Sequence, residues 1–225
     1  MVALQSNLAL RIASAAVLAP VAVGAAYFGG WPFAVFWAAA AIAVVWEWTR
    51  MVAGPIWIAS GIIYAAAMFV APVILRSDPA FGLLAIVLLF AIVWSTDIFG
   101  YFAGRAIGGP KLMPAVSPKK TWSGAIAGML GAMIIAVLVA KFFGSFSVVA
   151  IAAVALLLSI SAQAGDLFES WIKRKFGVKD SSQLIPGHGG VMDRLDGFWA
   201  AAVVGCIIGL LRGGFDAPAR GLLVW

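Results

Sequence analysis

Long apolar runs separated by short polar breaks dominate the hydrophobic pattern of the chain. An α-helix needs about 20 residues to cross the hydrocarbon core of a bilayer, and the runs approach or exceed that length. Glycine and proline interrupt them, as at Gly29-Gly30 and Gly54-Pro55. The seven runs cover residues 9–28, 31–48, 56–75, 81–101, 123–143, 147–172 and 192–212. The pattern predicts an all-α, polytopic membrane bundle of about seven transmembrane helices.

Composition supports the membrane assignment. Hydrophobic residues make up 64% of the 225 residues, charged residues make up 11%, and the mean hydropathy is +1.07. These values lie outside the range of soluble domains. The first run has no small-residue cleavage site followed by a soluble domain, so we expect it to be retained. The single cysteine, Cys206, excludes an intrachain disulfide.

The net charge of +6 could indicate nucleic-acid binding in a soluble protein. In a membrane protein, excess Lys and Arg instead mark cytoplasmic loops and contacts with anionic headgroups. We therefore expect the lipid bilayer as a partner and no nucleic acid.

The basic residues also indicate an orientation. With a cytoplasmic N-terminus and alternating spans, the cytoplasmic side receives Arg11, Arg50, Arg105, Lys111, Lys119, Lys120, Lys173, Arg174, Lys175, Lys179 and Arg194. The opposite side receives only Arg76, Lys141, Arg212 and Arg220. This asymmetry agrees with the positive-inside rule. We expect one domain, residues 1–225, in which spans 1–80 form a scaffold. The catalytic part is expected at 90–212, with cytoplasmic loops at 104–122 and 173–191.

Five carboxylates interrupt the apolar spans. Asp97 lies in the fourth run, Asp166 and Glu169 lie late in the sixth, and Asp193 and Asp196 open the seventh. An acid at the centre of a membrane helix costs about 3 kcal/mol on insertion scales, so each should face the bundle interior with a partner. Acids that converge from three helices predict a site for a hard cation such as Mg²⁺.

An alternative is that these acids pair with basic residues or cap the ends of helices. The basic candidates are Arg105, Arg174 and Arg194. Under the predicted topology all five acids lie in the cytoplasmic half of the membrane, and this clustering favours the metal site.

A second candidate site precedes the fifth run. Ser117-Pro118-Lys119-Lys120-Thr121 combines hydroxyls and two lysines at a helix start. Backbone N–H groups, the helix dipole and ammonium charge all favour phosphate there. The candidate phosphate-binding residues are Ser117, Lys119, Lys120 and Thr121. Ordinary positive-inside flanking would explain the two lysines but not the hydroxyls.

The third candidate is the stretch from Ser170 to Asp196, which contains the only histidine of the chain. Gly189 and Gly190 would let the backbone approach a ligand, and the helix that follows could receive phosphate at its N-terminus. His188 would bond phosphate or base or carry a proton, or else be an ordinary turn residue. Arg194 would face a phosphate or one of the aspartates. These residues together predict metal-dependent phosphoryl or nucleotidyl transfer at the cytoplasmic interface.

The same stretch carries a long gapped motif in fixed register. It reads Ser170-x-x-Lys173-Arg174-x4-Lys179-Asp180-x5-Pro186-x-His188-Gly189-Gly190-x-x-Asp193-Arg194-x-Asp196. The motif resembles the signature of the phosphatidate cytidylyltransferase family, the CDP-diacylglycerol synthases. The Ser-Pro-Lys-Lys-Thr run and the segment from Asp97 to Gly104-Arg105 resemble that family's other polar stretches. The resemblance covers residues 90–212, and the N-terminal spans match only in character.

The resemblance implies that CTP and phosphatidate are joined to give CDP-diacylglycerol and pyrophosphate, with Mg²⁺ and often a monovalent cation such as K⁺. It makes Asp166, Asp193 and Asp196 metal-site residues, with Asp97 as a further contributor. The implied catalytic set is Asp166, Lys173, His188, Arg194, Asp193 and Asp196. The implied substrate-binding set is Ser117, Lys119, Lys120, Thr121, Lys173, Arg174, Lys179, Gly189 and Gly190.

Two features depart from the family pattern. Ser123 stands where relatives often carry Glu or Gln, so one polar contact to the substrate or the metal shell is in doubt. The chain is also short for the family, and we expect it to lack one or two N-terminal spans of its relatives. A homodimer is compatible with the resemblance, but no sequence feature indicates one.

Other functions remain open at this point. A related CTP-dependent transferase would act on another lipid phosphate, and the apolar spans do not separate the two. A transporter would also use intramembrane acids. Against transport stand the absence of internal repeats and the concentration of polar residues on one face. We expect an integral protein of the bacterial inner membrane whose active site faces the cytoplasm.

Overall fold

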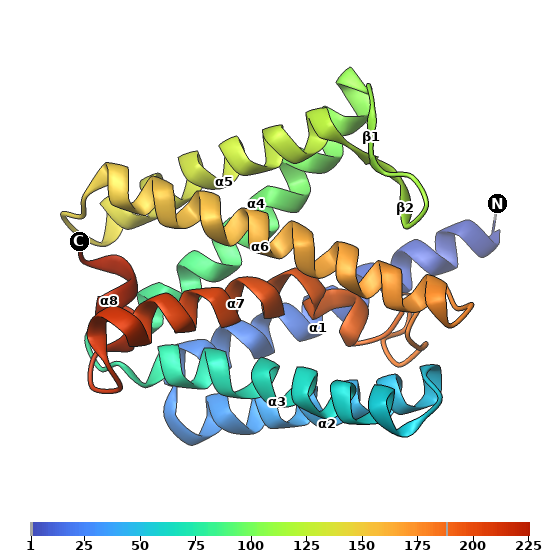
Figure 1. The fold of residues 1–225 in the computed structure, drawn as a ribbon, viewed down its shortest axis with the longest axis horizontal. Helices are drawn as coiled ribbons and strands as arrows, with labels where there is room; N and C mark the ends of the chain where they lie inside the picture. Colours follow the sequence, from blue (N-terminus) through green and yellow to red (C-terminus); the bar gives the residue numbers. More distant parts are fainter. Residues whose placement is uncertain (1, 188) are drawn as a thin grey trace.

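The computed structural model describes residues 2–187 and 189–225 as a bundle of helices with one small hairpin. The elements in chain order are α1 (Val2–Phe28), α2 (Gly30–Met51), α3 (Pro55–Ser77), α4 (Gly82–Ile107), β1 (Lys111–Met113), β2 (Ser117–Thr121), α5 (Trp122–Phe143), α6 (Val148–Lys175), α7 (Met192–Gly213) and α8 (Pro218–Leu223). The long helices run up and down beside one another, so their connections alternate between two ends (Figure 1). We call the end that carries β1, β2 and the α6–α7 connection the hairpin end.

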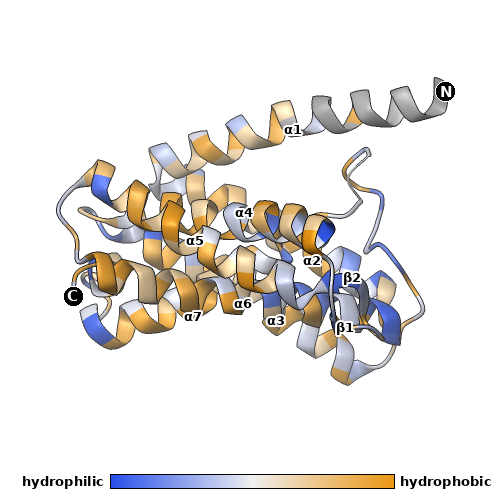
Figure 2. Ribbon diagram, turned by 90° about the horizontal axis from the view of Figure 1, so that it is seen from above, coloured by the Kyte–Doolittle hydropathy of each residue, from blue (hydrophilic) through white to orange (hydrophobic). Residues whose placement is uncertain are grey.

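Each of the seven predicted apolar runs corresponds to one helix. In the described part of the chain, six helices, α2 to α7, are long and apolar enough to cross a membrane. The apolar stretch recognised in α1, Ala16–Phe28, is shorter. Hydrophobic residues occupy the middle of the helices, and hydrophilic residues collect at their ends (Figure 2). The prediction of a polytopic helical membrane protein is confirmed.

The two connections predicted to carry chemistry lie at the same end of the bundle (Figure 1). The loop predicted at residues 104–122 contains regular structure, because α4 continues to Ile107 and β1 then pairs with β2 in antiparallel fashion. These strands are three and five residues long. They are too short and too polar to show the alternation that predicts a strand. The hairpin therefore adds a small sheet to a fold predicted as all-α.

Glycines set the spacing between α4 and α5. A Cβ atom added at Gly124 would lie 2.6 Å from the carbonyl oxygen of Gly100. One added at Gly128 would lie 2.7 Å from the carbonyl oxygen of Thr96. Small residues allow two backbones to approach closely, which is how helices commonly associate in membranes. This seam holds the polar face of α4 against the start of α5.

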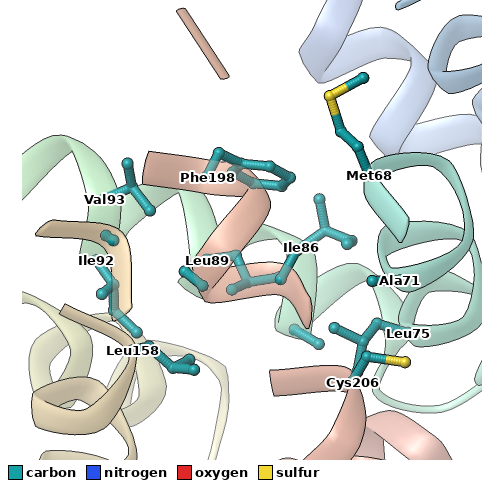
Figure 3. Packing of buried hydrophobic residues seen from close by; sticks show 14 of the residues in the cluster. Met68, Ala71, Leu75, Ile86, Leu89, Ile92, Val93, Leu158, Phe198 and Cys206 are labelled. Carbon is teal, nitrogen blue, oxygen red and sulfur yellow. The ribbon is translucent and has the colours of Figure 1, made fainter. Parts of the chain in front are cut away.

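The core of the bundle is apolar and draws on many helices. Side chains such as Leu75 of α3, Leu89 of α4 and Leu158 of α6 converge on α7 (Figure 3). The ring of Phe198 in α7 stacks on Trp37 of α2, with ring centroids 5.0 Å apart. The same Phe198 ring also stacks on Phe90 of α4, with ring centroids 4.7 Å apart. Packing of this kind fixes the first half of α7, where two candidate acids lie.

The α4–α5 seam gives a stability prediction. Gly128→Leu should destabilise the protein by about 1–3 kcal/mol, because the new side chain overlaps the backbone of α4. Gly24→Leu in α1 is the control, since a Cβ atom there meets nothing within 4 Å. Thermal unfolding in detergent measures both variants. Equal midpoints for the two would contradict the close packing of the seam.

Candidate active site

A cavity of about 540 Å³ lies at the hairpin end between α4, the hairpin, α5 and α6. Its acidic and basic lining residues are Asp97, Arg105, Lys111, Lys119 and Lys120. Four cations and one acid therefore line one hollow in an otherwise apolar protein. Such a surface suits a ligand that carries several negative charges.

One face of α4 forms a wall of this cavity. Among the residues of α4 that line it, five share a face of the helix, because the later four lie three, four, seven and eight positions after the first. They are Asp97, Gly100, Tyr101, Gly104 and Arg105. The two glycines leave room beside the acid. The guanidinium of Arg105 donates to the Tyr101 hydroxyl at 3.1 Å, which holds the Arg105 side chain along the helix. Sequence reasoning placed Arg105 and Lys111 among loop charges and missed them as lining residues.

The segment at the start of α5 is only partly free for a ligand. The Thr121 hydroxyl accepts a hydrogen bond from the Gly124 backbone N–H at 3.2 Å and so caps α5. Ser123 donates to the carbonyl oxygen of Gly108. Both hydroxyls thus shape the turn into the helix. Of the predicted phosphate cradle, Lys119, Lys120 and Thr121 line the cavity, whereas Ser117 pairs with Met113 in the hairpin.

An ion pair connects the cavity to α6. Lys120 on β2 donates to the Asp166 carboxylate, and each side chain keeps 29% of its surface exposed. Asp166 also accepts from Ser170, one helical turn further on, at 3.3 Å. Asp97 lies within electrostatic range of Asp166 and of Lys120. An acid of α4 and an acid of α6 therefore both lie near this lysine.

A second cluster lies between α6 and α7. The Lys173 ammonium donates to Glu169 at 2.9 Å and to Asp193 at 2.7 Å. Glu169 is fully buried, and its Oε2 atom has no hydrogen-bond partner in the described part of the chain. Asp196 lies within electrostatic range of Glu169 and Asp166. One ammonium thus serves two buried carboxylates from different helices.

Asp193 also organises the loop that precedes its own helix. Its carboxylate accepts from the Ser181 hydroxyl at 3.0 Å, from the Ser181 backbone N–H and from the Gly190 N–H at 2.8 Å. A Cβ atom at Gly189 would lie 2.9 Å from this carboxylate, and Gly189 has a φ of +89°. In this structure, therefore, the glycine backbone approaches a carboxylate of the protein itself.

The N-terminus of α7 is already occupied. The backbone N–H groups of Val191 and Met192 each donate at 2.8 Å to the carboxylate of Glu47 in α2. In this structure an internal acid takes these two donors, and the expected contact of this N-terminus with phosphate stays a prediction. Glu47 was missed in the sequence. The rule that singled out Asp97, an acid inside an apolar run, would have found it.

The remaining predicted residues are distributed as follows. Arg174 is exposed in the last turn of α6, where it donates to the carbonyl oxygen of Val178 at 3.2 Å, and Lys179 is exposed beyond the end of that helix. Arg194 lies within electrostatic range of Asp97. The predicted role of His188 falls on a position outside the described residues. The loop between α6 and α7 is therefore held mainly by Asp193 and Glu47.

The predicted metal ligands do not form one cluster. Within residues 2–187 and 189–225, no three His, Cys, Asp or Glu side chains are placed to hold a metal ion. Asp193 is bound by Lys173 and the loop, while Asp97, Asp166 and Asp196 lie within electrostatic range of one another. Mg²⁺ usually takes one or two carboxylates and completes its shell with water and substrate phosphate. Asp97 and Asp166, beside the cationic cavity, have the donor chemistry for such a site.

The fold and this site define a class: membrane-embedded enzymes that handle anionic substrates at one end of a helical bundle. The chain matches the family described as "Cytidylyltransferase family" over residues 54–211. It is 39% identical to a phosphatidate cytidylyltransferase of Brucella suis biovar 1 (strain 1330), over 95% of this chain and 97% of that protein. A phosphatidate cytidylyltransferase of Rickettsia bellii (strain RML369-C) is 41% identical over 85% of this chain and 86% of that protein. The chain belongs to the cytidylyltransferase family.

A third relative, the phosphatidate cytidylyltransferase of Haemophilus influenzae (strain ATCC 51907 / DSM 11121 / KW20 / Rd), is 44% identical over 55% of this chain and 45% of that protein. The match to the Brucella protein covers nearly the full length of both proteins, but the alignment runs over 263 residues against the 225 of this chain, so the expectation of a chain that is short for its family is not overturned.

The shared ammonium of Lys173 gives a second prediction. Lys173→Met leaves two buried carboxylates without their cation and should cost about 3–5 kcal/mol of stability. Lys179→Met, which alters an exposed side chain, should change stability by less than about 0.5 kcal/mol. Chemical unfolding in detergent compares the two variants. A Lys173→Met protein as stable as Lys179→Met would show that the ion pairs contribute nothing.

Proposed function

We propose that this protein transfers CMP from CTP to phosphatidate, giving CDP-diacylglycerol and pyrophosphate. The observation that supports this most directly is the cationic cavity. One of its lining residues, Lys120, is paired with Asp166 in the second half of α6. CTP and phosphatidate are both anions, and the second is a lipid. The names of the relatives point to the same reaction.

The chain's own cations would hold the triphosphate. Arg105, Lys111, Lys119 and Lys120 line the cavity, and their charge would stabilise negative charge that spreads onto the phosphate oxygens in the transition state. A phosphate oxygen of phosphatidate attacks the α-phosphorus of CTP and forms the new P–O bond. The bond between the α-phosphorus and the bridging oxygen breaks, and pyrophosphate leaves with its electron pair. Phosphatidate is already a competent nucleophile, so no general base and no covalent enzyme intermediate are required.

Asp97 and Asp166 are the proposed holders of Mg²⁺, with Asp196 close by. When bound, Mg²⁺ supplies charge neutralisation for the triphosphate and the leaving pyrophosphate. Substrate binding would separate the Lys120–Asp166 ion pair, because the lysine and the acid then each have a stronger partner. Before substrate binds, these two side chains therefore neutralise each other as an ion pair.

The position of the acids favours an enzyme over a transporter. Asp97 lies beyond the midpoint of α4, Asp166 lies beyond that of α6, and Asp193 opens α7. Because these helices alternate in direction, all three acids lie in the half of the bundle nearer the hairpin end (Figure 1). A transport path would need polar groups through the bundle, including its other half. We propose that the hairpin end faces the cytoplasm of the bacterial inner membrane, as its excess of basic residues suggests.

The reaction itself is the third prediction. Purified protein in mixed micelles should move labelled CMP from CTP to phosphatidate with Mg²⁺ and should stop when EDTA removes the metal. Asp166→Asn should lower kcat by at least about 100-fold, because it removes a charge beside the reacting phosphates. Asp216→Asn, an exposed acid at the opposite end, is the matched control and should keep full activity.

The same assay separates the alternative functions. If the protein labels a different lipid phosphate in preference to phosphatidate, that lipid is the acceptor, and the proposed transfer of CMP from CTP still holds. A well-folded protein that labels no lipid phosphate would overturn the proposed function and favour transport.

Lys120 gives the fourth prediction. Lys120→Met should raise KM for CTP by about 10-fold to 100-fold, since a hydrogen bond to a charged group contributes about 1.5–3 kcal/mol. Lys141→Met is the control, because Lys141 is exposed in the last turn of α5 at the other end of the bundle. Steady-state kinetics at saturating phosphatidate measure both. An unchanged KM for CTP in Lys120→Met would show that the cavity does not hold the triphosphate through this residue.

A further inference from the structure

Glu47 is a buried acid on a helix that lies outside the matched family region. Its side chain in α2 is fully buried, and the family match begins at residue 54. The sequence around it, Trp46-Glu47-Trp48, is otherwise apolar and aromatic. A buried charge of this kind is costly unless several donors compensate for it. The contacts of Glu47 show what it does.

Four donors converge on this one carboxylate. The Ser182 hydroxyl donates at 2.6 Å and the Val191 N–H at 2.8 Å to Oε1. The Met192 N–H donates at 2.8 Å and the Ser181 hydroxyl at 3.3 Å to Oε2. In the described part of the chain, Glu47 forms no ion pair. Its negative charge is compensated by these donors and by the helix dipole at the N-terminus of α7.

The network continues from Glu47 to the second cluster of the site. The Ser181 hydroxyl lies within hydrogen-bonding distance of both Glu47 and Asp193, and Asp193 in turn binds Lys173. Packing around Gly190 is equally tight. A Cβ atom there would lie 2.5 Å from Oε1 of Glu47. One acid of α2 thus holds both ends of the segment 181–192.

We infer that Glu47 is a positioning residue: it fixes the loop 181–191 and the first turn of α7, so that Asp193, Arg194 and Asp196 keep their places. The inference rests on the proposed function for its effect on catalysis. A carboxylate is required because each of its oxygens accepts from a different backbone N–H of α7. In Glu47→Gln one oxygen becomes an NH₂ donor, which faces a donor and cannot bond it.

The chain offers a matched control in Asp78. This acid is also buried, and it holds the turn before α4 by accepting from the N–H groups of Ala80 at 3.0 Å and Phe81 at 2.9 Å. It also accepts from the N–H of Arg220 at 2.8 Å. Asp78 lies at the end of the bundle opposite the hairpin. Asp78→Asn keeps an acceptor oxygen for Ala80 and Phe81 but turns an NH₂ donor toward the Arg220 N–H, which is the same kind of mismatch as in Glu47→Gln and lies away from the site.

The experiment compares wild type, Glu47→Gln, Glu47→Asp and Asp78→Asn in detergent. Three quantities are measured: the unfolding midpoint, kcat and KM for CTP, and hydrogen–deuterium exchange of residues 181–193. Glu47→Gln should speed exchange in that segment about tenfold, the usual effect of losing a helix cap. It should lower kcat by about 10-fold to 100-fold, as expected when support of an active-site group is lost. Glu47→Asp, which keeps both acceptor oxygens, should restore part of the lost kcat.

Asp78→Asn should lower the unfolding midpoint to a similar degree but leave kcat and exchange at 181–193 near wild type. Equal losses of kcat in Glu47→Gln and Asp78→Asn would overturn the inference, because general destabilisation would then explain both. Wild-type kcat and exchange in Glu47→Gln would also overturn it.

Two further arms keep the test decisive. If Glu47→Gln does not fold, Ser182→Ala removes a single donor to Glu47 and should still speed exchange at 181–193; unchanged exchange would overturn the inference. If wild type transfers no CMP, the proposed function fails. The exchange comparison then decides alone whether Glu47 holds the loop.

Discussion

A carboxylate buried in an apolar bundle must find donors inside the protein, and this constraint decides how the hairpin end is built. Lys173 is the donor for Glu169 and Asp193, and four hydrogen-bond donors surround Glu47. Because the acids and their donors come from α2, α6, α7 and the loop between the last two, each satisfied charge ties distant segments together. Removing one partner would leave a buried charge without compensation, which is why such contacts hold geometry so firmly.

The cavity depends on a different kind of constraint. Glycines at positions 100, 124 and 128 bring α4 and α5 into close contact near the hairpin end, and Gly100 and Gly124 also line the hollow. The hairpin supplies cations and α4 supplies an acid, so opposite charges line the same space. The Lys120–Asp166 pair connects this hollow to the buried network of α6 and α7. Close packing on one side and charge pairing on the other thus define one site.

Much of this arrangement could be predicted from particular residues. The apolar runs located all seven long helices, since the length of a membrane span constrains them strongly. Acids inside apolar runs identified Asp97, Asp166, Asp193 and Asp196 as functional candidates, and the gapped motif from Ser170 to Asp196 indicated the family. The hairpin was missed because its strands are too short to show a pattern. Glu47 lies inside an apolar run like Asp97 and could have been singled out by the same rule, but its partners, which lie more than 130 residues away in the chain, could not.

The sequence by itself determined the class of fold, the side of the bundle that carries charge and the family of the enzyme. These follow from local composition, spacing and motif, which the chain carries before it folds. Only the tertiary structure decided which charge meets which. It paired Lys120 with Asp166, Lys173 with Glu169 and Asp193, and two N–H groups at the start of α7 with Glu47. The reason is that pairing depends on distances between helices, and those distances are set by side-chain packing across the bundle, which no local pattern records.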